Sequence, residues 1–462
     1  MMNERRLSRR SLLRLSAVVA GAATLAACGA TAVPAATTAP TAATGGQATT
    51  APTQAAPAPT LAPTTGSEVT VQVWHGFTGP DADTFKSMVE KWFYPLQPSI
   101  KVELTPDTVE DKLLPAISGG NPPDASFGSV YSSLLLWGIQ GALIDLQPLV
   151  DKDQMDLSVF IPAGLEPEQW KGKTYGLPFV NYNQGFYWNK ALFREAGLDD
   201  SRPPKDWNEL ADYATKLTKK DSNGNLTQLG WLPVSGTYDF AELVLANGGQ
   251  LYDKASGAIT ANSPKVLEAL EWEYKVAKDL GIELVNGFRS SFASGDDPFM
   301  LGKVAQRIDG DWYVAWSKRL APTLDFMTAA TPATDPQYYP SNVVLYNATV
   351  IPNGAKHQAD AWTFVKWMTT DVELSKEFAL AVGNLPQLKA AIPGWSPDPR
   401  LQVFLEISNS PHAGYWAAIP AENKYDTELT NAISAVYAGK ATPKDALDNV
   451  QQVVTEEEAK YA

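Results

Sequence analysis

The sequence contains very few of the residues that bind metals or form disulfides. Its 462 residues include one cysteine, Cys28, and three histidines, His75, His357 and His412, which lie far apart. A single cysteine excludes an internal disulfide framework, and the histidines do not have the spacing of a zinc site. We therefore expect no metal site, no redox chemistry and no cofactor.

Basic residues are scarce as well. The formal net charge is −14 at pH 7, and residues 1–27 hold five Arg and one Glu, so the rest of the chain carries 32 basic against 50 acidic residues, or −18. Nucleic-acid binding depends on clustered Lys and Arg that neutralise phosphates. We therefore expect no nucleic-acid partner.

The chain begins with a segment typical of exported lipoproteins. SRRSLLR at 8–14 resembles a twin-arginine export motif, and the apolar run at 15–27 is shorter than the ~20 residues of a comfortable membrane span. LAAC at 25–28 resembles a lipobox, in which the cysteine receives a diacylglyceryl group. We predict that residues 1–27 are a signal peptide and that Cys28 carries the lipid, with an uncleaved signal anchor as the alternative.

The next stretch lacks charge altogether. Residues 29–67 are almost entirely Ala, Thr, Pro and Gly. Such a segment buries too little apolar surface to offset its chain entropy, so we predict that 28–67 form the lipidated cysteine and a disordered tether. Its 39 residues have a flexible-coil reach of roughly 35 Å.

The remaining chain has the composition of a folded protein rich in aromatic residues, and it is too long for one typical domain. VTVQVW at 69–74 predicts a buried strand, and 81–93 has helical spacing with Asp81 as the expected N-cap. Two further strands and the helix between them follow at 101–106, 123–128 and 107–118. This alternation predicts a parallel α/β sheet, whose ligands bind at the carboxyl ends of the strands.

Several separated stretches resemble one known family in the same order. They are VWHGFTG at 73–79, GNPPDASF at 120–127, YGLPFVNYNQGFYWNKALFREAGLD at 175–199, FMLGKVAQRIDGDWYVAW at 299–316, GNLPQLKAA at 383–391 and ISAVYAGKATPKDALDNVQQVV at 433–454. The chain is similar to extracellular solute-binding proteins of family 1, the sugar-binding proteins of ABC importers. The resemblance covers nearly everything after the tether.

The resemblance implies a two-lobed periplasmic-binding-protein fold of type II, closing over its ligand by hinge motion. It places lobe 1 at 68–178 plus 338–368 and lobe 2 at 179–337 plus 369–462. It also implies a membrane-anchored, non-enzymatic subunit outside the cytoplasmic membrane that captures a carbohydrate and delivers it to ABC permease subunits. We expect a monomer.

A sugar site needs flat aromatic rings for the CH faces and short polar or carboxylate side chains for the hydroxyls. Fourteen tryptophans are more than cores usually require, which favours stacking surfaces. The ligand-binding candidates at strand ends and in the crossing segments are His75, Phe77, Thr78, Ser129, Tyr131, Asn181, Tyr182, Asn183, Trp231, Tyr238, Tyr346 and Trp416, with Asp239 as a weaker one. Ser129 has an alternative role as a helix cap.

The IDGDW turn at 308–312 is the strongest single candidate. Gly310 lets the backbone approach a ligand closely, Asp309 or Asp311 accepts sugar hydroxyls, and Trp312 occupies the place of a stacking tryptophan in the family. The alternative is an ordinary helix N-cap at Asp311.

Other functions remain open at this point. A secreted glycoside hydrolase needs two carboxylates on opposite sides of a bond, and two aspartates two residues apart on one turn do not provide them. A surface adhesion module is the third possibility. Arginine is scarce in the proposed cleft, which disfavours a phosphorylated ligand, with Arg289 and Arg400 as candidate exceptions.

Overall fold

The computed structural model describes residues 68–461 except 107–109, 129–131, 235, 397 and 415–416. These residues belong to one compact unit, which extends from Ala58 to Ala462. The predicted signal peptide, Cys28 and the tether lie outside the described residues. Within the described residues, no helix has the length and apolar character needed to cross a membrane.

Lobe 1 is built on a parallel sheet. Strand β1 (Val69–His75) lies between β2 (Ile100–Thr105) and β3 (Ala125–Phe127) and runs parallel to both. The predicted strands are therefore confirmed, as is the parallel sheet. The helices of this lobe are α2 (Gly79–Met88), α3 (Glu110–Ser118), α4 (Leu134–Ile139), α5 (Gln147–Lys152), α6 (Pro162–Leu165), α13 (Gln358–Thr370) and α14 (Val372–Val382), and a small hairpin joins β4 (Gln169–Trp170) to β5 (Lys173–Thr174).

Helix α2 starts earlier than the sequence predicts. Its N-cap residue is Thr78, and Asp81 lies in the first turn, so the predicted N-cap is wrong. The reason is Pro80, whose restricted φ and missing N–H suit the first turn of a helix. The helix continues as a π-helix over Val89–Phe93, and its buried face carries Phe85.

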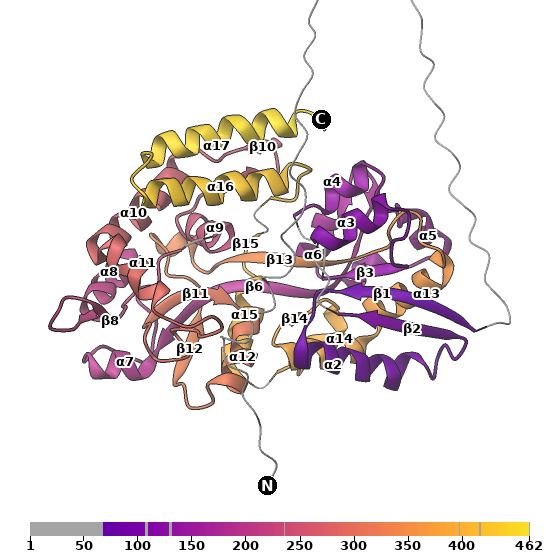
Figure 1. Cartoon of the computed structure of the whole chain (residues 1–462), viewed down its shortest axis with the longest axis horizontal. Coiled ribbons are helices and arrows are strands. Elements are labelled where there is room, and N and C mark those ends of the chain that lie inside the picture. The colour runs from indigo at the N-terminus through magenta and orange to yellow at the C-terminus, as the bar shows by residue number, and fades with distance from the viewer. Residues whose placement is uncertain are drawn as a thin grey trace, which may run out of the picture. The chain divides into compact units, whose positions relative to one another are not determined.

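Two long strands connect the lobes (Figure 1). Strand β6 (Leu177–Asn189) and strand β13 (Ser341–Val350) pair antiparallel, with an irregular register between Tyr346 and Ala348. In lobe 1, β13 pairs with β3 and β6 pairs with β14 (Leu385–Pro386). In lobe 2, β6 pairs with β11 (Gln306–Gly310) and β12 (Phe326–Ala329), and β13 pairs with β15 (His412–Gly414).

Helices surround the sheet of lobe 2. They are α7 (Lys190–Glu195), α8 (Trp207–Lys216), α9 (Thr237–Ala246), α10 (Pro264–Leu280), α11 (Ile282–Ser290), α12 (Trp312–Leu320), α15 (Pro399–Ser408), α16 (Glu422–Tyr437) and α17 (Pro443–Glu458). Two short hairpins pair β7 (Lys219–Lys220) with β8 (Leu226–Gln228) and β9 (Tyr252–Asp253) with β10 (Ala258–Ile259).

The predicted lobe boundaries need two corrections. Helix α14, assigned to lobe 2 by its position after 368, packs in lobe 1: the Phe378 ring centroid lies 5.0 Å from that of Phe77 and 5.1 Å from that of Phe179. Strand β13 was expected to return to lobe 1 near 338, but its first residues pair with β15 of lobe 2. The aromatic core of lobe 1 therefore draws its last helix from beyond the second crossing.

Candidate functional site

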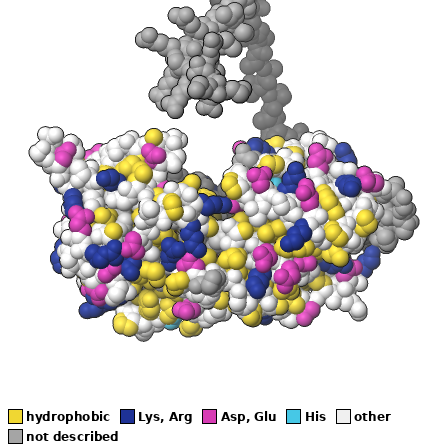
Figure 2. All heavy atoms as spheres, turned by 90° about the horizontal axis from the view of Figure 1, so that it is seen from below, with side chains coloured by type: hydrophobic (Ala, Val, Ile, Leu, Met, Phe, Trp, Pro, Cys, Tyr) yellow, Lys and Arg dark blue, Asp and Glu magenta, His cyan; other side chains and the backbone are white. Residues whose placement is uncertain are grey.

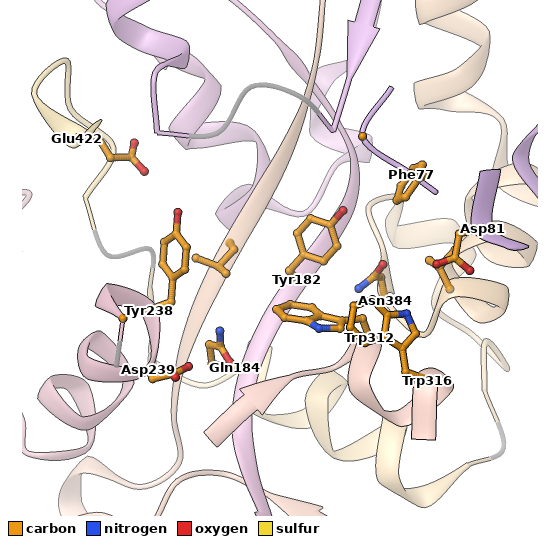
Figure 3. A pocket seen from close by; sticks show the side chains of 14 residues that line it. Phe77, Asp81, Tyr182, Gln184, Tyr238, Asp239, Trp312, Trp316, Asn384 and Glu422 are labelled. Atoms are coloured by element: carbon orange, nitrogen blue, oxygen red, sulfur yellow. The ribbon is translucent and has the colours of Figure 1, made fainter. Parts of the chain in front are cut away.

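A cavity of about 550 Å³ opens between the two lobes, a volume within the usual range for small-molecule sites. We call it the interlobe pocket. Figure 3 shows the side chains that line it. They come from both lobes: Gly76, Phe77, Asp81, Tyr182, Gln184, Gly236, Tyr238, Asp239, Trp312, Trp316, Leu345, Val382, Asn384 and Glu422.

Five of the fourteen lining residues carry aromatic rings. The rings of Trp312 and Tyr182 pack edge to face, with centroids 5.5 Å apart and planes at 85°. Asn347 Nδ2 donates to the Tyr182 hydroxyl at 2.6 Å and so holds that ring in place. On α12, Trp316 lies one turn beyond Trp312, and this residue is 41% exposed. Together with Phe77 these rings offer flat apolar faces on both lobes.

Gly310 is needed beneath the Trp312 ring. A Cβ atom at this position would lie 2.0 Å from an indole carbon, a distance that real contacts do not reach. The close approach at Gly310 is thus to a protein side chain, and the glycine leaves the room that the indole occupies beside β11.

Asp311 is the centre of a buried polar network behind the pocket. Asn384 Nδ2 donates to one of its carboxylate oxygens at 2.8 Å and Asn183 Nδ2 donates to the other at 3.3 Å. Asn342 Nδ2 donates to Asn183 Oδ1 at 2.7 Å. Burial raises the pKa of Asp311 to about 8, with the two amide donors acting in the opposite direction. The network ties both crossing strands to the start of α12 and so positions Trp312.

The polar cluster predicted at 181–183 splits between two sides of β6. Tyr182 lines the pocket, whereas Asn181 and Asn183 are 1% and 0% exposed and do not line it. Successive side chains on a strand point to opposite faces, so the pocket side continues with Gln184 instead. Asn181 and Asn183 therefore do not belong to the described lining, because both point away from the cavity that Tyr182 faces.

Two predicted contacts lie in the hydrophobic core. His75 is 1% exposed, its ring is stacked on Phe127 at 5.3 Å, and burial lowers its pKa to about 4. Trp231 is fully buried; its Nε1 donates to Glu273 at 3.1 Å and its ring stacks on Phe186 at 6.3 Å. Because both are packed in the core, neither residue belongs to the described lining of the interlobe pocket.

The carboxylates of the two aspartates in the IDGDW turn also have protein partners. Asp309 forms an ion pair with Arg307, and Asp311 has the amide partners described above, so neither lines the pocket. Both carboxylates therefore bind protein groups in this structure and support the turn, and their contact with a sugar stays a prediction. Thr78 is exposed beside Phe77 at the start of α2 and does not line the pocket. Ser129, Tyr131, Trp416 and the side chain of Tyr346 lie outside the described residues.

The lining is acidic. It contains three carboxylates, those of Asp81, Asp239 and Glu422, and the described lining residues include no Lys, Arg or His. The two candidate arginines are engaged elsewhere: Arg289 donates to the Pro233 carbonyl and Arg400 forms an ion pair with Asp398. The described part of the pocket therefore offers no cation to an anionic ligand, and no cluster of metal-ligating side chains is present in the described residues.

Polar contacts join the lobes around the pocket. Arg319 of α12 pairs with Asp81 of α2 at 2.7 Å, and Asn423 Nδ2 of α16 donates to Ser133 Oγ at 3.3 Å. Lys254 of lobe 2 also pairs with Glu166 of lobe 1. These contacts join the edges of the two lobes around the interlobe pocket.

Several lining residues were missed from the sequence. Strand alternation from Tyr182 would have found Gln184, and helical spacing from Trp312 would have found Trp316. Val382 ends α14 and Asn384 lies just after it, and both were missed because the sequence did not show that α14 packs in lobe 1. Glu422, the first residue of α16, gave no local signal.

Comparisons with known proteins agree with this architecture. A sequence model of bacterial extracellular solute-binding proteins matches residues 78–373. The maltotriose-binding protein of Pyrococcus abyssi is 25% identical over 375 residues, covering 80% of this chain and 75% of that protein. The sn-glycerol-3-phosphate-binding periplasmic protein of Pectobacterium atrosepticum is 23% identical over 313 residues, covering 64% and 69%. The solved structure of CpMnBP1 with mannotriose bound is 30% identical, with a TM-score of 0.74, and covers 84% of this chain and 100% of that chain.

Proposed function

The chain belongs to the bacterial extracellular solute-binding proteins, as the sequence resemblance predicted, and we propose that it captures a carbohydrate in the interlobe pocket for an ABC-type importer. Its fold is the two-lobed type II periplasmic-binding-protein fold. The observation that carries the proposal is the pocket itself, in which aromatic rings from both lobes surround carboxylate and carboxamide groups. A mono- or oligosaccharide presents the apolar faces and hydroxyls that match this lining.

Capture depends on contacts with both lobes. Phe77 lies in lobe 1 and Trp312 in lobe 2, so a sugar between them favours the arrangement in which the lobes approach. The crossing strands β6 and β13 provide the hinge in this proposal, and the Asp81–Arg319 pair stabilises the closed rim. The closed protein then docks on the permease subunits and releases the sugar to them.

The lipid anchor completes the proposal. Cys28 carries a diacylglyceryl group after removal of 1–27, and the tether over 28–67 lets the body move beside the outer face of the cytoplasmic membrane. Two acyl chains hold far more firmly than one, at about 0.8 kcal/mol per buried methylene.

Figure 2 shows basic and acidic side chains intermixed on one face, without the continuous basic patch that nucleic acid requires.

The test is a binding screen followed by an activity assay. Thermal-shift measurements with mono- and oligosaccharides, polyols and sn-glycerol 3-phosphate identify the ligand, because binding to the native state raises its melting temperature. We expect a neutral or cationic sugar to bind and sn-glycerol 3-phosphate not to. Stoichiometric binding without turnover supports the proposal, whereas hydrolysis of a labelled oligosaccharide favours a glycoside hydrolase instead.

A further inference from the structure

The charges around the interlobe pocket are not evenly compensated. Of its three carboxylates, Asp81 has a cationic partner in Arg319, at 2.7 Å. Asp239 of α9 has no hydrogen bond or ion pair to its carboxylate among the described residues. One acidic group of the lining is therefore available to a ligand.

The groups that face Asp239 leave its charge unmatched. The charged groups that act on it most strongly are Asp309 and Arg307 of β11, Arg289 of α11 and Glu273 of α10, and Glu242 of α9 adds a further negative charge. Arg307 is shared between Asp297 and Asp309, and Arg289 donates to a backbone carbonyl. Burial, followed by the charge of Asp309, raises the pKa of Asp239 to about 7. A cation placed beside Asp239 would favour its ionised form.

Gln184 adds a second unmatched acceptor to the same pocket. It is 3% exposed, it lines the cavity, and its Oε1 accepts no hydrogen bond from the described residues. The strand register places it opposite Gly310, next to Asp309, the residue whose charge acts on Asp239. Figure 3 shows Gln184 and Asp239 near one end of the pocket. The helix dipole of α9 accounts for an acid in its first turn but not for this buried amide oxygen.

Hydrogen-bond capacity distinguishes the ligands that suit such a site. A sugar hydroxyl donates one hydrogen and needs donors for its own lone pairs, whereas an ammonium group donates three hydrogens and accepts none. A buried acceptor without a donor costs about 1 to 3 kcal/mol, so a ligand that supplies several donors is favoured. Aromatic faces such as those of Trp312 and Tyr238 also attract cations.

We propose that the pocket selects a carbohydrate bearing a primary ammonium group, an amino sugar, with the ammonium between the Asp239 carboxylate and Gln184 Oε1. The sugar ring then lies against the aromatic residues. This inference rests on the proposed carbohydrate-binding function and names its substrate class. It requires ligand and pocket to carry opposite charges, which a neutral sugar does not provide.

The test uses pairs of sugars that differ by an amino group in place of a hydroxyl. Isothermal titration calorimetry at pH 7 compares glucosamine with glucose, mannosamine with mannose, galactosamine with galactose, and the β-1,4-linked dimers of glucosamine and glucose. We expect the amino sugar of at least one pair to bind ten-fold or more tightly than its neutral partner.

Two variants locate the preference. Asp239→Asn keeps the shape of the side chain and removes its charge, so it should abolish the preference for the amino sugar. It removes a half-buried charge without taking a partner from any described residue, and its melting temperature checks that it folds. Asp279→Asn makes the same charge change on the surface of α10, where the carboxylate is 56% exposed, and should retain the preference.

The outcomes separate this inference from the proposed function. If neutral sugars bind as tightly as their amino counterparts, or if Asp239→Asn keeps the preference, the amino-sugar inference is wrong and the carbohydrate function stands. If no sugar binds, in these pairs or in the wider thermal-shift screen, both are refuted. Binding of spermidine without any sugar would likewise refute both, because the site would then recognise a cation that is not a carbohydrate.

Discussion

Truncation of Trp312 tests whether the aromatic lining binds the ligand. Its indole packs against Gly310 and meets the Tyr182 ring in an edge-to-face contact, and it lines the pocket. Trp312→Ala removes this stacking surface but leaves the buried Asp311 network intact. The backbone at the start of α12 should therefore keep its position.

The expected loss follows from buried area. A tryptophan buries on the order of 200 Å², and a sugar stacked on one face covers about half of it. At about 25 cal/mol per Å² this area contributes about 2.5 kcal/mol, which corresponds to roughly a 60-fold change in dissociation constant. We expect a loss of at least ten-fold.

Calorimetry with the ligand from the thermal-shift screen measures this loss. Trp272→Ala is the matched control, because Trp272 packs on Trp207 at 4.4 Å and does not line the interlobe pocket. The control should lower the melting temperature and leave the affinity unchanged. An affinity of Trp312→Ala within two-fold of the wild type would refute the stacking role of this residue.

Three further predictions concern packing, pH and anchoring. Gly310→Ala should reduce both the melting temperature and the ligand affinity, because its Cβ would meet the Trp312 ring. Gly287→Ala is the control and should be tolerated, because a Cβ there has no neighbour within 4 Å. Equal effects of the two substitutions would contradict this reasoning. Burial raises the pKa of Glu242 to about 8, above the value of about 4.3 in an unfolded chain. Proton binding by Glu242 therefore stabilises the folded state at low pH, and this stabilisation is lost as the pH rises from about 4.3 to about 8. Glu242→Gln should therefore melt progressively higher than the wild type as pH rises from 5 to 9, and parallel pH profiles would refute this. Cys28→Ser should move the protein from membrane to soluble fractions without changing sugar affinity; unchanged membrane retention would refute the lipid anchor.

Local sequence patterns were enough to predict several residues of the pocket lining. The β-branched run at 69–74 predicted β1, and the order of motifs along the chain predicted the family and its two lobes. Phe77, Tyr182, Tyr238 and Trp312 were identified from their places at strand ends and turns, and all four line the pocket.

At β6 and β11 the structure differs from the sequence-based expectation in the orientation and partners of the side chains. Asn181 and Asn183 were taken together with Tyr182 because the three are contiguous, but alternation sends them to the opposite face. Asp309 and Asp311 were expected to meet the ligand. Asp309 instead pairs with Arg307, two residues away on the same strand. Asp311 accepts hydrogen bonds from Asn183 and Asn384, which are far away in the sequence. The sequence shows which side chains are polar, but it does not show which groups they pair with in the folded protein.

Local composition, periodicity and motif order were enough to identify the family and the aromatic character of the site, and they also predict the export signal and the tether. The tertiary structure was needed to show which rings face the cavity, that α14 belongs to lobe 1, and that no described cation pairs with Asp239 as Arg319 pairs with Asp81. The physical reason is that hydrogen bonds, ion pairs and core contacts join residues more than 100 positions apart, such as Asn183 with Asp311 and Asp81 with Arg319, and no local pattern records them.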